Sequence, residues 1–397
     1  MPSRKKRVLL LIETSREYGR GIISGVTQYV KEHENWNIYF EDRGLNEPNP
    51  IHFKYWDGII SRLPKPEDAA ALRNSGVPFV ELLSTDTETH FPEVQGDSTA
   101  ICEVAIEHFL ERHLKHFAYF SLFKTWWSVH RSKVFVDSLA RQGYSCSIYN
   151  ALDDDNTAHP SPMIYWNRNF GVGLPKWLAS LPKPTGLLVT TDSYAMYVFE
   201  ACHSLGIAIP EEIAILGIDN DELFCHALNP PLSSIDQNSK IVGYYAAEIL
   251  EKKMKHRFVT KTPIFTPPAY VVSRKSTDIV NINDEDVVHA LRFIRENISQ
   301  SMDVHDLVKE LNLSRSTLER RFRQSLGTSP SDEIKRCRMN RAKELLRESD
   351  QTISKIAIQC GFTEMDYFIR TFRRTCGKTP SQYRASFQMI PHDELDQ

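Results

Sequence analysis

Two copies of one pattern in the last third of the chain constrain its fold more than any other feature. The first copy occupies residues 304–330 and the second residues 353–380. Apolar positions in the first half of each copy match at a spacing of 49 residues, and aromatic, arginine, glycine and proline positions in the second half match at a spacing of 50. Each copy has the apolar spacing of a short helix, a turn and a second helix. The sequence therefore predicts an all-α module with two helix-turn-helix motifs.

The second helix of each copy has a core face and an opposite polar face. In the first copy Leu318 and Phe322 stand four residues apart and must face the core. Phe368 and Phe372 do the same in the second copy. The opposite faces carry the candidate DNA-binding residues, which are Arg315, Ser316, Thr317, Glu319, Arg320, Arg323, Met365, Asp366, Ile369, Arg370 and Arg373. Arginine on such a face can bridge O6 and N7 of guanine in a major groove. A solvated charged face is the alternative, but it does not explain why arginine recurs at the same register in both copies.

Local signals predict how the two motifs begin and how they are joined. We expect Ser314 and Thr363 to cap the two second helices, because their hydroxyl oxygens can accept hydrogen bonds from free backbone N–H groups. A long helix at residues 331–349 joins the copies, so the two polar faces could enter successive major grooves about 34 Å apart on one side of a duplex. Residues 281–390 carry 19 basic and 15 acidic side chains, and this basic excess suits an anionic partner.

The C-terminal module resembles the DNA-binding domain of the AraC/XylS family over about residues 286–386. The resemblance is most specific in the second copy, IAIQCGFTEMDYFIRTFRRTCGKTPSQYR, which contains the Gly361-Phe362 pair and closes with Pro380 and Tyr383. It implies that double-stranded DNA is a partner of this module.

The preceding sequence has the alternating texture of an α/β protein. Short apolar runs occur at residues 7–13, 36–40, 58–63, 79–83, 116–123, 185–191 and 213–219. Several runs are rich in β-branched or aromatic residues, and the segments between them have helical spacing. This pattern predicts two doubly wound lobes, each with a parallel sheet covered by helices, and a cleft between them.

Polar residues that follow the predicted strands are candidates for effector binding, because ligands of open α/β sheets lie at the carboxyl ends of the strands. Carboxylate, amide and guanidinium groups can bind the hydroxyl pairs of a sugar, and tryptophan can cover its apolar face. Acidic residues after strands also cap helices and form turns, which is the alternative for each one. The candidates are Glu13, Ser15, Tyr18, Arg20, Asp97, Trp126 with its neighbour Trp127, Arg131, Trp166, Asp192, Asp219, Asn220 and Gln237.

Residues 5–278 resemble the periplasmic-binding-protein-like effector domain of LacI/GalR-type regulators, most specifically in the GIDN segment that contains Asp219 and Asn220. The resemblance implies sugar contacts at these two residues, at Asp192, at Arg131 and at Gln237. That family's N-terminal DNA-binding helices are missing here, since the first strand begins by residue 7. We therefore expect an effector domain at 1–278, a linker at 279–285, a DNA-binding domain at 286–388 and an acidic tail at 389–397.

An AraC-type module behind a LacI-like domain is similar to a group of sugar-responsive activators of transcription. This likeness implies D-xylose as the favoured effector, with Glu13, Thr14 and Arg20 as specificity positions. It also implies direct-repeat operators, RNA polymerase as a partner and a homodimer. A different sugar, or repression instead of activation, remains open.

Other classes of protein fit the sequence less well. Gly19 to Gly25 superficially match a dinucleotide-binding fingerprint, but six residues separate the apolar run from the first glycine, where a tight turn is needed. No GxSxG or HExxH motif occurs, and the seven cysteines form no CxxC pair, so we expect no enzyme, metal or cofactor. A transport solute-binding protein would need an export signal, which we do not find, and no apolar run reaches the roughly 18 residues of a membrane span. We expect a cytoplasmic protein.

Overall fold

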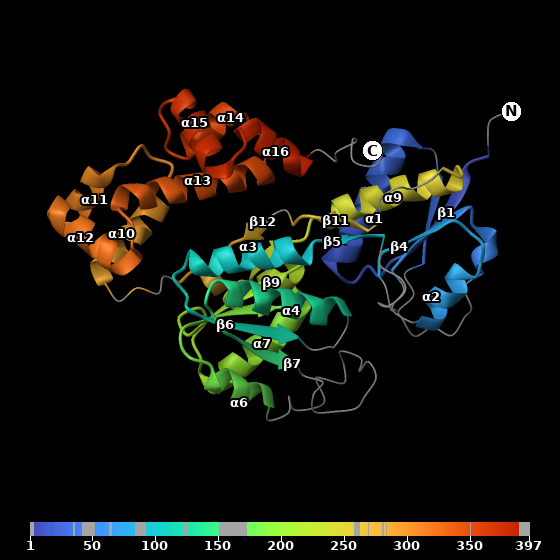
Figure 1. The fold of residues 1–397 in the computed structure, drawn as a ribbon, viewed down its shortest axis with the longest axis horizontal. Helices are drawn as coiled ribbons and strands as arrows, with labels where there is room; N and C mark the ends of the chain where they lie inside the picture. The colour runs from blue at the N-terminus through green and yellow to red at the C-terminus, as the bar shows by residue number, and fades with distance from the viewer. Residues whose placement is uncertain are drawn as a thin grey trace. The chain divides into compact units, whose positions relative to one another are not determined.

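The computed structural model contains two compact units, which divide between residues 279 and 280 (Figure 1). The described residues are 4–34, 36–41, 52–62, 66–83, 93–121, 126–150, 173–257, 263–268, 270–279, 282, 284–349 and 351–388. Each unit has its own buried core.

The first lobe of the N-terminal unit is built on a parallel sheet of four strands in the order β2-β1-β3-β4. The strands are β1 (Lys6–Leu11), β2 (Trp36–Phe40), β3 (Gly58–Ser61) and β4 (Phe79–Glu81), and the helices are α1 (Glu17–His33), α2 (Pro66–Arg73) and α9 (Ser239–Met254), with a 3-10 turn η1 (Phe53–Tyr55). Helices α1 and α9 lie side by side (Figure 1). A Cβ on Gly25 would stand 1.9 Å from the Lys240 carbonyl oxygen, and one on Gly243 would stand 1.9 Å from that of Ile22. Glycine is needed at both positions because the two helix backbones touch.

The second lobe is built on a sheet of six strands in the order β12-β10-β9-β8-β6-β7, in which only β12 runs antiparallel to its neighbour. The strands are β6 (His116–Ser121), β7 (Cys146–Asn150), β8 (Thr185–Val189), β9 (Ile213–Ile218), β10 (Ser233–Asp236) and β12 (Tyr270–Val272). Helices α3 (Ser98–Leu110) and α4 (Trp126–Arg141) pack in one core cluster, and α6 (Gly173–Ser180) and α7 (Asp192–Leu205) pack in another. Alternate residues of the same strands belong to the two clusters, so helices cover both faces of the sheet.

The chain passes between the lobes three times. The first passage follows β5 (Val94–Gly96), the second lies between β10 and α9, and the third lies between β11 (Ile264–Thr266) and β12. Strands β5 and β11 pair in parallel as a separate small sheet. The remaining elements of this unit are α8 (Glu222–Ala227) and the 3-10 turn η3 (Lys275–Thr277). Three connecting segments are consistent with lobes that can move about a hinge.

The C-terminal unit is all helical in its described residues. Its elements are α10 (Glu285–Glu296), α11 (Val304–Leu311), α12 (Arg315–Leu326), α13 (Pro330–Glu348), α14 (Ile353–Gln359), α15 (Met365–Cys376) and α16 (Pro380–Gln388). Leu318 and Phe322 are fully buried in one core cluster, and Phe368 and Phe372 are fully buried in a second. The predicted core faces of both second helices are therefore confirmed.

One of the two predicted helix caps is wrong. Ser314 caps α12 and accepts a hydrogen bond from the Thr317 backbone N–H. Thr363 does not cap α15, because Glu364 occupies the cap position and makes no side-chain capping bond. Phe362 packs into the second core and the chain continues for two residues beyond it before the helix begins, which the spacing of polar residues did not reveal.

Candidate functional site

A pocket lies between the two lobes of the N-terminal unit, at the carboxyl ends of strands from both sheets. The space between its lining residues is about 700 Å³ when the open solvent at its mouth is included. Seven of the thirteen candidate effector residues line it, namely Glu13, Tyr18, Trp126, Trp127, Arg131, Asp219 and Gln237. The edge where parallel strands end is therefore the feature that brings these side chains together.

A chain of hydrogen bonds from the second lobe fixes the polar wall of the pocket. The Gln237 amide nitrogen donates to the Asp219 carboxylate, and Arg131 Nη2 donates to Gln237 Oε1 over 3.0 Å. Arg131 Nη1 also donates to the Thr190 carbonyl oxygen at 3.4 Å. Burial raises the pKa of Asp219 to about 6, against the opposing effect of Arg16 and Arg131. This wall offers an acceptor and fixed donors to a polar ligand.

Aromatic rings supply the apolar part of the pocket and support its arginines. The Arg131 guanidinium lies 5.6 Å from the centre of the Trp127 ring, and Trp126 stacks on the ring of His130. In the first lobe the Arg62 guanidinium lies 5.2 Å from the centre of the Tyr18 ring. Such contacts hold a cation in place while its N–H groups stay free to donate.

Five other candidates with a described position lie outside the pocket, and most of them have partners within the protein. Ser15 is exposed and does not line the pocket. Asp97 caps α3 by accepting hydrogen bonds from the backbone N–H groups of Thr99 and Ala100, which is the alternative expected of acidic residues after strands. The Asn220 side-chain oxygen accepts a hydrogen bond from Arg274 Nη2 at 2.9 Å. Trp166 lies outside the described residues.

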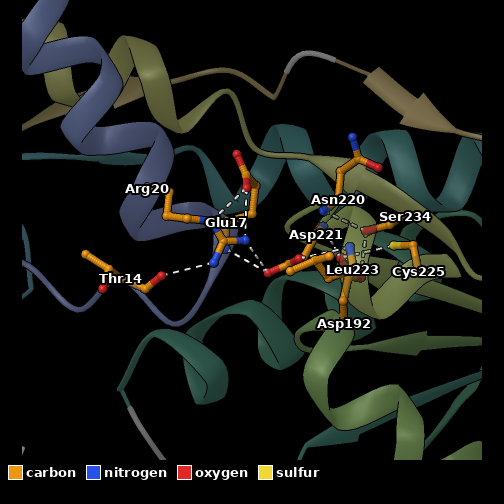
Figure 2. Close-up of polar contacts among 9 residues, drawn as sticks. All are labelled: Thr14, Glu17, Arg20, Asp192, Asn220, Asp221, Leu223, Cys225 and Ser234. Atoms are coloured by element: carbon orange, nitrogen blue, oxygen red, sulfur yellow. Dashed lines mark hydrogen bonds and ion pairs between the residues drawn. The ribbon is translucent and has the colours of Figure 1, made fainter. Parts of the chain in front are cut away.

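The last two of these five candidates, Asp192 and Arg20, belong to a polar cluster outside the pocket lining (Figure 2). The Asp192 carboxylate is buried and accepts hydrogen bonds from the Ser234 hydroxyl at 2.6 Å and the Asp221 backbone N–H at 2.8 Å. Burial raises the pKa of Asp192 well above its ordinary range. Asp192 therefore fixes the loop that carries Asp221, and it does not line the pocket.

Asp221 connects the two lobes. Its carboxylate belongs to the second lobe, and it accepts hydrogen bonds from the backbone N–H of Glu17 and from Arg20 Nη2, both at 2.9 Å. Glu17 and Arg20 lie on α1 of the first lobe, and Figure 2 shows Arg20 reaching across to Asp221. The Asp221 side chain is 3% exposed and that of Arg20 is 35% exposed. We call the contacts among Glu17, Arg20 and Asp221 the interlobe latch.

Sequence reasoning missed several residues that line the pocket. They are Arg16, Gly19, Arg62, Leu82, Leu83, Gln95, Gly96, Ser98 and Thr191. Arg16 lies in the same loop as the candidates after the first strand, and its guanidinium is 5.5 Å from the centre of the Tyr194 ring of the second lobe. Arg62 lies inside the third apolar run, just after β3, so the strand-end rule itself could have identified it.

Most of the candidate DNA-binding residues lie on the exposed sides of α12 and α15. Ile369 is half-buried and packs against the second core, so its predicted position on the outer face is only partly met. Arg323, Arg370 and Arg373 are exposed. Arg315 makes a surface ion pair with Glu319 at 3.3 Å, and such an exposed pair is weak enough to be broken by a phosphate or a base. Both helices therefore present cationic side chains away from the buried cores.

Arg338 on α13 ties the two helix-turn-helix motifs together. Its Nη2 donates to the Met302 carbonyl oxygen at 2.7 Å, just before the first motif. Its guanidinium also lies 5.6 Å from the centre of the Phe362 ring in the second motif. Gly361 has a φ of +72°, and a Cβ there would stand 2.4 Å from the Gln300 carbonyl oxygen. This close approach fixes how α12 and α15 are placed within the C-terminal unit.

Among the residues that the structure describes, no group of histidine, cysteine and carboxylate side chains could hold a metal ion. No helix in the described ranges is both long and apolar enough to span a membrane.

Known proteins share this architecture over nearly the full length of the chain. Family models match as an XylR N-terminal domain at residues 7–100, a periplasmic binding protein-like domain at 106–277 and a helix-turn-helix domain at 307–386. A solved structure described as a xylose-binding transcription activator superposes with a TM-score of 0.60 and 28% identity, and the match covers 97% of this chain and 99% of that one. A periplasmic binding protein/LacI regulator from Alkaliphilus metalliredigens, 18% identical with a TM-score of 0.53, shares the fold over 69% of this chain and 99% of its own. The predicted two-part fold class is confirmed.

Two curated relatives span nearly the full length. The xylose operon regulatory protein of Escherichia coli K12 is 28% identical over 394 residues, which cover 97% of this chain and 98% of that protein. The xylose operon regulatory protein of Haemophilus influenzae is 31% identical over 386 residues, which cover 95% of this chain and 98% of that protein. These relatives are transcription regulators and not enzymes, and the chain belongs to their family, the xylose operon regulatory proteins.

Proposed function

We propose that this chain is a D-xylose-responsive activator of transcription. The polar wall formed by Asp219, Gln237 and Arg131 carries the effector part of this proposal, because it presents an acceptor and fixed donors inside a pocket that residues of both lobes line. The names of the full-length relatives support D-xylose over other sugars.

Closure of the two lobes on the sugar is the step that we propose for sensing. The pocket is lined from both lobes, so a sugar that bridges them binds the closed form better than the open form. The interlobe latch stabilises the same closed form without touching the pocket. Effector and latch therefore act on one equilibrium.

DNA binding is proposed for the exposed faces of α12 and α15. Two such faces in one unit suit two successive major grooves, and a homodimer would then occupy direct repeats. RNA polymerase would be recruited by the bound dimer in the cytoplasm. Under this proposal the N-terminal unit is the effector domain and the C-terminal unit is the DNA-binding domain, as the expected boundary at 279–285 requires.

Calorimetric titration tests the effector part. The purified full-length chain should bind D-xylose at one site, and L-arabinose, D-ribose and D-glucose should bind more weakly. Asp219→Ala should abolish the binding, whereas Glu222→Ala, an exposed carboxylate on α8, should leave it intact. Tighter binding of another sugar would replace D-xylose as the effector, and absence of heat with every sugar would reject the proposal for the pocket.

A further inference from the structure

Arg62 is the arginine of the pocket whose donors are uncommitted. Arg131 donates to Gln237 and to the Thr190 carbonyl oxygen, and Arg16 forms a hydrogen bond and a cation–π contact with Tyr194. The Nε atoms of Arg62 and Arg131 are both buried without a partner. Arg62 differs from the other two arginines because its whole side chain makes no hydrogen bond or ion pair among the described residues. A guanidinium carries five N–H donors in a planar fork. Arg62 therefore offers N–H donors without acceptors among the described residues to the pocket that it lines.

The position of Arg62 directs these donors toward a ligand. It follows β3 of the first lobe and lines the same pocket as Asp219, which follows β9 of the second lobe. The Tyr18 ring, 5.2 Å from the guanidinium carbon, supports one face of the fork. Tyr18 is itself held in the pocket wall. The fork is therefore positioned before any ligand arrives.

The charges around the pocket indicate what Arg62 can bind. Arg16, Arg62 and Arg131 line the pocket with the carboxylates Glu13 and Asp219. Arg16 and Arg131 act on the Asp219 carboxylate more strongly than Arg62 does. The two carboxylates face the other arginines, and among the described residues none supplies the Arg62 side chain with a hydrogen-bond acceptor. Parallel N–H groups of a guanidinium match two adjacent oxygens.

We propose that Arg62 is a specificity-determining residue that binds two adjacent hydroxyl oxygens of a neutral sugar from the side of the first lobe. This inference rests on the proposed function of the pocket. Arg62 would recognise the relative orientation of the hydroxyl pair, because an inverted hydroxyl leaves one N–H without an acceptor and that loss discriminates strongly in a buried site.

Calorimetry on the full-length chain tests this with D-xylose and its three single-centre epimers, D-lyxose, D-ribose and L-arabinose. Arg62→Met keeps an unbranched side chain but removes the guanidinium, with all its donors and its contact with the Tyr18 ring. We expect it to weaken D-xylose binding by at least about 10-fold and to reduce at least one ratio of D-xylose affinity to epimer affinity. Arg62→Lys, which keeps the charge but not the fork, should recover only part of the affinity. The ratio of D-xylose affinity to epimer affinity is measured on one preparation of each variant, so it does not depend on the fraction of that protein that is folded.

Arg7→Met is the matched control, because Arg7 is a first-lobe arginine that lies over the Trp56 ring at 5.0 Å and does not line the pocket. It should bind all four pentoses as the wild type does. Equal affinities and equal ratios in Arg62→Met and Arg7→Met would overturn the role of Arg62 while leaving the pocket's function standing. Tighter binding of D-xylonate than of D-xylose by the wild type, lost in Arg62→Met, would overturn the assignment of a neutral sugar. A wild type that binds no pentose would reject the proposed function and this inference with it.

Discussion

Replacement of Asp221 by asparagine tests whether closure of the lobes contributes to effector affinity. Asp221 lies outside the pocket, so the substitution removes no contact with the ligand. Asparagine keeps the size and one carbonyl acceptor for the Glu17 backbone N–H, but it removes the negative charge that attracts Arg20. The closed form should lose more stability than the open form, because opening the lobes would separate Glu17 and Arg20 from Asp221, whereas the bond from the Leu223 backbone N–H lies within the second lobe.

The structure sets the size of the effect. A hydrogen bond between charged groups contributes about 1.5–3 kcal/mol. The Arg20 side chain is 35% exposed and also pairs with Glu17 at 3.0 Å, so solvent and this second partner reduce the loss. We expect the closed form to lose about 1–2 kcal/mol, which raises the Kd for D-xylose by about 5- to 30-fold.

Calorimetry gives the Kd, and stopped-flow displacement gives the dissociation rate, which should account for most of the change because the open form is less affected. Glu222→Gln removes the neighbouring carboxylate of α8, which is exposed, and should leave the Kd unchanged. A folded Asp221→Asn variant with wild-type affinity for D-xylose would refute the coupling between the latch and the pocket.

Three further substitutions have defined outcomes. Arg370→Ala should weaken binding to a selected operator by about 1–3 kcal/mol and to random duplex far less, as measured by fluorescence anisotropy; equal losses would make Arg370 a phosphate contact. Burial raises the pKa of Asp219 to about 6 from an ordinary 3.8, so the folded state favours the protonated form and loses stability as the pH rises through 6. Asp219→Asn should therefore be more stable than the wild type at pH 8, and this advantage should disappear near pH 4; thermal unfolding that shows the reverse order would contradict the burial argument. Gly361→Ala should lower the melting temperature of the C-terminal unit more than Gly327→Ala, since both residues have positive φ but only Gly361 has backbone within 4 Å of a new Cβ; equal shifts would mean that the clash is relieved.

The fold followed from periodicity because burial acts on every strand and helix in the same way. The apolar runs at 185–191 and 213–219 became β8 and β9, which are buried along their whole length. Phe368 and Phe372 are fully buried because their spacing leaves them no other face. Short strands such as β5 and β11 have only three residues each, too few for a period to be recognised.

The pocket was predicted only in part, because sequence identifies strand ends but not the direction of each side chain. Asp192 and Asp219 both follow strands of the second lobe, yet Asp192 turns inward to Ser234 while Asp219 lines the pocket. Asp219 has a φ of +112°, a backbone conformation that its residue type does not reveal. Asp221, one residue beyond the predicted pair, forms the latch because α1 of the other lobe approaches it, and no local pattern encodes that approach.

The central claim is that D-xylose bound by the N-terminal unit controls DNA binding by the C-terminal unit. Selection of genomic fragments by the full-length chain, with and without D-xylose, tests it most directly. The account predicts that D-xylose enriches fragments with a direct repeat, and that Asp219→Ala protein enriches none in response to the sugar. Equal enrichment of the same fragments with and without D-xylose would contradict it.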